Sequence, residues 1–234
     1  ESQGNLEAAL EYYHAANDYQ AMARVLTEVA PDLMERGRLM SLQRYFRVLP
    51  DAVISERPLL LLYKGDLLRR MGQSGEAIIC YEGSRLAFEA AKDHAGVSRS
   101  LTALGEIARS QGDYLRAQTL VSQALEYASK EDHVGRAYAL MALAKCVGFL
   151  SDMDQGRSLA EQAVAEVRQA GRQISPLTRA DLLRSLGQIC WWQGDPQACA
   201  HYCREALQTL GDDLSMTTAR ANLTLSIPHL FWGD

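Results

Sequence analysis

The chain has 234 residues, of which 47% are apolar and 23% charged, and its formal net charge is −5. This composition, with only six prolines, is typical of a helical globular protein and gives no sign of intrinsic disorder. The mild negative charge provides no electrostatic footprint for nucleic acid. We therefore expect no direct nucleic-acid contact by this segment.

Hydropathy and cysteine content predict the cellular compartment of the protein. The longest apolar run, residues 59–63, is closed by Lys64 and Asp66, far short of the roughly 20 residues that a membrane helix needs. Five cysteines, an odd number in a chain of this length, suit a reducing compartment better than a disulfide framework. The sequence predicts a cytoplasmic protein without a membrane segment.

A turn signal recurs about every forty residues, which indicates an array of helix-turn-helix units. It pairs a small residue with Asp or Asn at Gly4-Asn5, Gly112-Asp113, Ser151-Asp152, Gly194-Asp195 and Gly233-Asp234, with weaker versions at Gly37-Arg38 and residues 72–75. Because the chain begins and ends at such turns, we expect a piece of a longer solenoid. Its first and last helices would then each lack a partner.

The two terminal half-repeats are expected to carry apolar surface. Ala9, Tyr13 and Ala16 have the Ala-aromatic-Ala signature of a second repeat helix, and residues 214–232 resemble a first helix that Pro228 should kink or end. The apolar residues concerned are Leu6, Leu10, Tyr12, Tyr13, Leu223, Leu225, Ile227, Leu230, Phe231 and Trp232. The sequence predicts self-association through at least one of these ends.

Four internal units follow the tetratricopeptide pattern of paired helices with small residues where the helices cross. In the clearest unit, Leu104-Gly105 marks the first helix, and Ala117 and Ala124 mark the second. Asp113 and Asp195 are expected to cap second helices, as Asp132 and Ser175 should cap first helices. The predicted fold is all-α, a tetratricopeptide-like α-solenoid forming a right-handed superhelix of antiparallel helix pairs. We expect N-terminal helical units over residues 1–57 and repeats over 58–234.

Three cysteines of one repeat raise the question of a metal or redox site. Cys190, Cys199 and Cys203 converge near His201, but all three fall on internal positions of the repeat, and their spacing matches no usual zinc pattern. The sequence therefore predicts buried packing thiols, no metal, and His201 pointing away. No motif of a nucleophile, metal-dependent or dinucleotide-binding enzyme is present, so we expect no catalysis and no cofactor.

The first helix of each pair supplies a predicted inner face for a ligand or partner. Its residues are Asp66, Arg69, Arg70, Arg99, Glu106, Arg109, Tyr138, Met141, Lys145, Arg184, Gln188, Trp191 and Trp192. Arginine forks and flat aromatic rings together suit a partner with carboxylate or phosphate groups and an apolar body. The alternative is that the charged residues are merely solvated and that Trp192 packs between units.

Residues 33–77 also carry a family resemblance. The segments 33–39, Leu49-Pro50, 57–60, Gly72 and Glu76-Ala77 resemble the start of the helical-repeat region in MalT-like regulators of the LuxR family, and residues 8–19 resemble the segment that precedes it there. The resemblance implies a sensor domain that binds an inducer and controls self-association. In that family an ATPase and a DNA-binding domain flank the repeats, whereas this chain has no phosphate-loop motif and no basic recognition helix.

Two functional predictions follow from these observations. The first is a non-enzymatic sensor and protein-interaction domain of a MalT-like regulator, which binds a small-molecule inducer, a peptide or a protein in the inner face. The alternative is a free-standing tetratricopeptide-type interaction adaptor.

Overall fold

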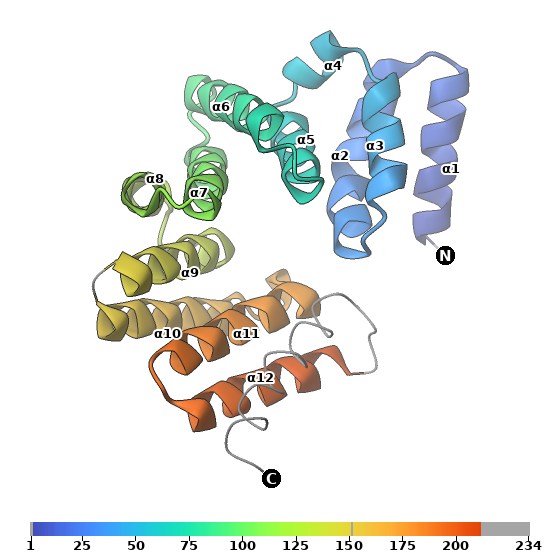
Figure 1. Ribbon diagram of the computed structural model, residues 1–234. Helices are drawn as coiled ribbons and strands as arrows, with labels where there is room; N and C mark the ends of the chain where they lie inside the picture. Colours follow the sequence, from blue (N-terminus) through green and yellow to red (C-terminus); the bar gives the residue numbers. More distant parts are fainter. Residues whose placement is uncertain (1, 151, 212–234) are drawn as a thin grey trace. The chain divides into compact units, whose positions relative to one another are not determined.

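The computed structural model describes residues 2–150 and 152–211, which form helices joined by short turns (Figure 1). The predicted all-α, helical-repeat solenoid is therefore confirmed. The helices are α1 (Ser2–Ala15), α2 (Tyr19–Glu35), α3 (Leu39–Val48), α4 (Asp51–Ser55), α5 (Pro58–Arg70), α6 (Ser74–Ala90), α7 (His94–Ser110), α8 (Tyr114–Tyr127), α9 (His133–Leu150), α10 (Met153–Ala170), α11 (Pro176–Trp192) and α12 (Pro196–Leu210), with a 3-10 turn at Gly171–Gln173.

The chain divides into two compact units, residues 1–107 and 108–234, and the boundary lies within α7. The predicted boundary at residue 57 concerns the type of repeat and stays a prediction, as does the handedness of the superhelix. None of the helices in the described ranges is long and apolar enough to cross a bilayer.

The core of the first unit forms around α2. Met22, Leu26 and Leu33 follow the spacing of one helix face and are fully buried, because α2 packs against α1, α3 and α5. Leu10 of α1 joins this core and is also fully buried, whereas Tyr12 is 70% exposed. The expected apolar surface at the N-terminal end is therefore smaller than predicted, since α2 covers Leu10.

The second unit is built from closely paired helices, and small residues lie where the helices of each pair cross. The pairs α9/α10 and α11/α12 make extensive contacts (Figure 1). Ala144, Ala160 and Ala163 are fully buried between α9 and α10, as the repeat pattern predicts. Gly156 lies so close to α9 that an added Cβ would come within 2.8 Å of the Gly148 Cα.

Side-chain caps begin the helices where the sequence predicted them. Asp113 and Asp195 accept hydrogen bonds from the backbone N–H groups of the third residues after them, at 3.1 and 2.9 Å. Asp132 and Ser175 make equivalent bonds of 2.9 and 3.1 Å. These bonds satisfy donors that the first helical turn leaves unpaired.

The C-terminal half-repeat lies outside the described residues. This applies to the predicted helix over residues 214–232, to Pro228, and to the apolar residues Leu223, Leu225, Ile227, Leu230, Phe231 and Trp232. Self-association through that end stays a prediction.

The contact between Gly148 and Gly156 generates a stability prediction. Replacing Gly156 by Ala would force α9 and α10 apart, and we expect the free energy of unfolding to fall by about 1–3 kcal/mol. Gly148→Ala is the matched control, because its added Cβ would lie 3.8 Å from the nearest atom outside its own helix. There the helix propensity of Ala should stabilise by up to about 1 kcal/mol. Urea unfolding of both variants measures the difference, and equal effects would contradict the predicted crossing.

Candidate functional site

The predicted inner face of the first unit involves α5 and α7. Arg69 and Arg99 are exposed, while Asp66 and Glu106 are half-buried. Behind the exposed arginine, Tyr81 Oη donates a hydrogen bond of 2.7 Å to Asp66 Oδ1, and Arg69 Nε donates one of 3.3 Å to Tyr81 Oη. Burial raises the pKa of the Asp66 carboxyl, although Arg69 and the Tyr81 hydrogen bond oppose the shift.

Electrostatic contacts join the two helices of this face. The negative charge of Glu106 on α7 acts to raise the pKa of Arg69 on α5. The positive charge of Arg99 on α7 acts to lower the pKa of Tyr63 on α5. We call Asp66 and Arg69 on α5, with Arg99 and Glu106 on α7, the α5/α7 face; its role as a binding face stays a prediction. Arg70 departs from it, because its Nη1 donates to the Met34 carbonyl of α2 at 3.3 Å.

The predicted inner face of the second unit is less available. Arg184 donates from Nε and Nη2 to Asp181 Oδ1 at 3.1 and 2.8 Å, and only 12% of its side chain is exposed. An arginine paired within its own helix has little capacity left for a partner. Met141 is 1% exposed and belongs to the core, which corrects its assignment to the face.

The remaining predicted residues of the second unit are partly available. Tyr138 is 43% exposed, and its hydroxyl donates to Thr178 Oγ1 across the α9/α11 contact at 3.1 Å. Trp191 packs against the core of this unit. Arg109, Lys145 and Gln188 are half-buried. Tyr138 is thus the most accessible of these side chains.

The three cysteines of the last pair are free thiols without exposure, as predicted. Burial raises the pKa of Cys190 to about 11, and the hydrogen bond that the Cys199 thiol donates to Cys203, together with burial, raises the pKa of Cys199. His201 is exposed and lies outside this cluster. Within the described ranges, no group of three or more His, Cys, Asp or Glu side chains is arranged to hold a metal ion.

Sequence reasoning missed an aromatic ridge at the turns of the second unit. Phe149, at the end of α9, stacks on Tyr114, the first residue of α8, with centroids 4.5 Å apart and planes inclined by 10°. Trp192, the last residue of α11, approaches Phe149 edge-on at 6.2 Å. Phe149 is 60% and Trp192 37% exposed. We call Tyr114, Phe149 and Trp192 the aromatic ridge.

The signal for this ridge was present in the sequence. Each of its residues lies within three positions of a Gly-Asp or Ser-Asp turn, and successive turns of a repeat array lie along one edge. The repeat pattern predicts Trp192 as an inner-face or packing residue and makes no prediction for Phe149. The period locates the helices, whereas the residues beside successive turns indicate the ridge.

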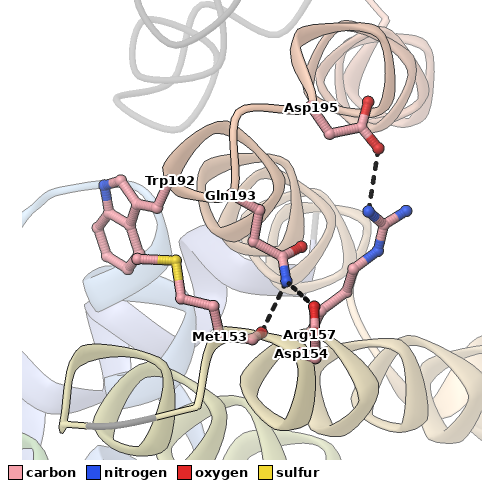
Figure 2. A pocket seen from close by; sticks show the side chains of 6 residues that line it. All are labelled: Met153, Asp154, Arg157, Trp192, Gln193 and Asp195. Atoms are coloured by element: carbon pink, nitrogen blue, oxygen red, sulfur yellow. Dashed lines mark hydrogen bonds and ion pairs between the residues drawn. The ribbon is translucent and has the colours of Figure 1, made fainter.

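A pocket of about 330 Å³ adjoins the ridge at Trp192 (Figure 2). Its lining comprises Met153, Asp154, Arg157, Trp192, Gln193 and Asp195, from the starts of α10 and α12 and the end of α11. Figure 2 shows the Met153 thioether beside the Trp192 ring. We call these six residues the ridge pocket.

Polar contacts hold the ridge pocket together. Gln193 Nε2 donates to the Met153 carbonyl at 2.8 Å and to Asp154 Oδ1 at 3.2 Å (Figure 2). Arg157 donates from Nη1 to Asp195 Oδ2 and from Nε to Glu161 Oε1, each at 3.0 Å. The guanidinium therefore binds two carboxylates, and its bond to Asp195 joins α10 to the start of α12.

Comparison with known proteins supports the repeat. Residues 56–130, which include α5 and α6, match the tetratricopeptide repeat family. These residues form a tetratricopeptide-repeat region. No curated protein sequence matches the chain.

Solved structures show the same fold over most of the chain. The structure of BtubC (BKLC) from P. vanneervenii has a TM-score of 0.61 at 16% identity, covering 88% of this chain and 89% of that one. A thermophilic TPR protein from Thermus thermophilus has the same TM-score and identity, covering 87% of this chain and 99% of that one. At such identity, the likeness concerns the fold alone.

Asp195, which caps the N-terminus of α12 and lines the ridge pocket, yields a second prediction. Asp195→Ala removes both the cap and the ion pair with Arg157, and should lower the free energy of unfolding by about 1 kcal/mol at pH 7. Asp195→Asn keeps a capping oxygen and loses only the ion pair. We expect it to cost less than Ala, because partly exposed pairs contribute about 0–1 kcal/mol.

The pH dependence of these variants separates the two contributions. The backbone N–H of Ala198, followed by Arg157, lowers the pKa of Asp195 from its ordinary value of 3.8. The stabilisation from the ionised carboxylate is therefore present above that value and is lost as the pH falls through the lower folded pKa. The difference between wild type and Asp195→Asn in urea unfolding should shrink below about pH 4. A difference independent of pH would contradict the assignment.

Proposed function

We propose that this protein is a non-enzymatic, tetratricopeptide-type interaction domain, and that the α5/α7 face binds an acidic segment of a partner protein. The repeat fold supports an interaction role, since repeat arrays offer extended surfaces built from successive units. The observation that carries the proposal is the pair of exposed arginine residues, Arg69 and Arg99, on α5 and α7. Each can bind a carboxylate in bidentate fashion.

The polar network behind this face supports a binding role for Arg69. The side chain is held at its Nε by Tyr81, whose hydroxyl is in turn held by Asp66. A guanidinium fixed in this way loses less conformational entropy when a partner binds. The Tyr81 bond uses the Nε group, and the charges of Asp66 and Glu106 act on the same guanidinium.

A wider biological role is also proposed. The resemblance of residues 33–77 to MalT-like regulators favours a sensor domain with an inducer and controlled self-association, whereas the comparisons support the repeat alone. A free-standing interaction adaptor agrees at least as well with them. We place the domain in the cytoplasm, because five free, buried cysteines suit a reducing compartment.

The third prediction tests the α5/α7 face. Peptides selected by the protein from a displayed random library should be enriched in Asp and Glu. Titration calorimetry with a selected acidic peptide should show at least about tenfold weaker binding for Arg69→Ala/Arg99→Ala, since a charge-assisted hydrogen bond contributes about 1.5–3 kcal/mol. Arg47→Ala is the matched control, because Arg47 is an exposed arginine on α3, outside the face.

Three outcomes decide this proposal. Weaker binding by the double variant, with Arg47→Ala unchanged, supports it. An equal loss of affinity in both variants would show that net charge alone causes the effect and would contradict the proposal. No loss of affinity in either variant would overturn the assignment. Arg69→Lys is a further check, because an ammonium keeps the charge and loses the bidentate fork, so that partial weakening is expected.

A further inference from the structure

The α5/α7 face carries its own carboxylates beside its arginines. Asp66 and Arg69 lie on α5, and Arg99 and Glu106 lie on α7. With both carboxylates ionised, these four side chains carry no net charge. A face without net charge attracts an acidic segment less than its arginines alone would, because part of their field is cancelled. The ionisation of its carboxylates therefore decides how well the face binds such a segment.

A buried hydroxyl group joins one of these carboxylates to an arginine. Tyr81 is fully buried, and an added Cβ on Gly65 would come within 2.6 Å of its ring. This packing fixes the Tyr81 hydroxyl, which donates to Asp66 Oδ1 at 2.7 Å and accepts from Arg69 Nε at 3.3 Å. Asp66 and Arg69 are thus held on either side of one oxygen atom.

The charged and titratable groups around Asp66 and Arg69 come from three helices. They are Tyr63, Arg69 and Arg70 of α5, Tyr81 of α6, and Arg99 and Glu106 of α7. Within the described ranges, α2, α3 and α4 also pack on α5 but contribute no charged group to the shift of Asp66. Burial raises the pKa of Asp66 above its ordinary value of 3.8, although Arg69, the Tyr81 hydrogen bond and Arg70 oppose the shift.

An acidic partner and Asp66 act on the same guanidinium. Ionised Asp66 interacts favourably with Arg69 from within the protein, and it repels the negative charge of a partner that approaches Arg69. Protonation of Asp66 ends both effects. A neutral carboxyl group still has an oxygen that accepts the Tyr81 hydrogen bond, so the position of the hydroxyl can persist while the charge is removed. The face then carries a net positive charge.

We propose that Asp66 regulates the α5/α7 face: ionised Asp66 weakens the binding of an acidic partner segment, and protonation of Asp66 strengthens it. The inference rests on the proposed function of this face and adds the residue that controls it. Because the bound anion disfavours ionised Asp66, the pKa of Asp66 is higher in the complex than in the free protein. Binding therefore takes up protons, and the affinity rises as the pH falls through these two values.

The probe is a peptide whose charge stays constant with pH. A capped alanine peptide bearing several cysteic acid residues keeps its sulfonates ionised, whereas Asp and Glu side chains would begin to titrate. Calorimetry with the full chain from pH 7 to about pH 5 stays above the ordinary pKa values of carboxyl groups. We expect the dissociation constant to fall at least about threefold over this range. The observed heat should also depend on the ionisation enthalpy of the buffer, which measures proton uptake.

Two variants identify the group that titrates. Asp66→Asn removes the charge and keeps an oxygen for the Tyr81 bond, so it should bind about threefold more tightly than wild type at pH 7 and lose the pH dependence. Glu106→Gln is the matched control, because it removes the same charge from the same face. It should also bind more tightly at pH 7, but it should keep the pH dependence. Any contribution from histidines would persist in both variants.

A direct titration covers the case in which Asp66→Asn does not fold, which circular dichroism would show. The carboxyl carbon resonance of Asp66 in the wild-type protein should titrate above the ordinary 3.8. Its midpoint should rise further when the peptide saturates the protein. An unchanged midpoint would overturn the inference.

The calorimetric outcomes separate this inference from the proposed function. A pH-dependent affinity in wild type and Glu106→Gln that is absent from Asp66→Asn supports the role of Asp66. An affinity of the wild type that does not change with pH, or an equal pH dependence in Asp66→Asn, would overturn that role and leave the face as a binding site. No binding at any pH, or equal binding by Arg69→Ala/Arg99→Ala, would overturn both proposals.

Discussion

Close approach of paired helices at small residues is the constraint on which the fold depends. Gly156 sits against the Gly148 backbone, an added Cβ on Gly187 would meet Cys203 Sγ at 3.0 Å, and Gly65 lies against the Tyr81 ring. Each contact joins the first helix of a pair to its second helix. Because a side chain at any of these points would separate the helices, the large core residues fill the spaces to either side.

This close pairing also determines what happens at the turns. Helices that pair so tightly can be joined by only a few residues, and left-handed glycines at Gly112 and Gly194 make those turns. An aspartate then follows to cap the next helix, as Asp113 and Asp195 do. The aspartates at the turns are therefore explained by helix capping. The exposed aromatic residues beside them are not needed for capping or for the core.

The sequence predicted the features that repeat and missed those that depend on a particular partner. The period, the caps at Asp113 and Asp195 and the buried thiols follow from local chemistry and were confirmed. Arg184 was assigned to the inner face by its register, but Asp181 lies three residues earlier on the same helix and binds it. Register gives the face of a helix on which a residue lies, whereas rotamer and pairing decide whether its charge is available.

The two surfaces differ in the reason for their charge, and this difference bears on specificity. On the α5/α7 face, Arg69 is held at its Nε by Tyr81 and is influenced by the charges of Asp66 and Glu106. In the ridge pocket, Arg157 donates to the carboxylates of Asp195 and Glu161, so the same type of residue joins α10 to the start of α12. An arginine can therefore present donors to a ligand or join neighbouring helices, according to whether its donors are already engaged. Counting charges along the sequence does not separate these cases, whereas following each hydrogen bond to its acceptor does.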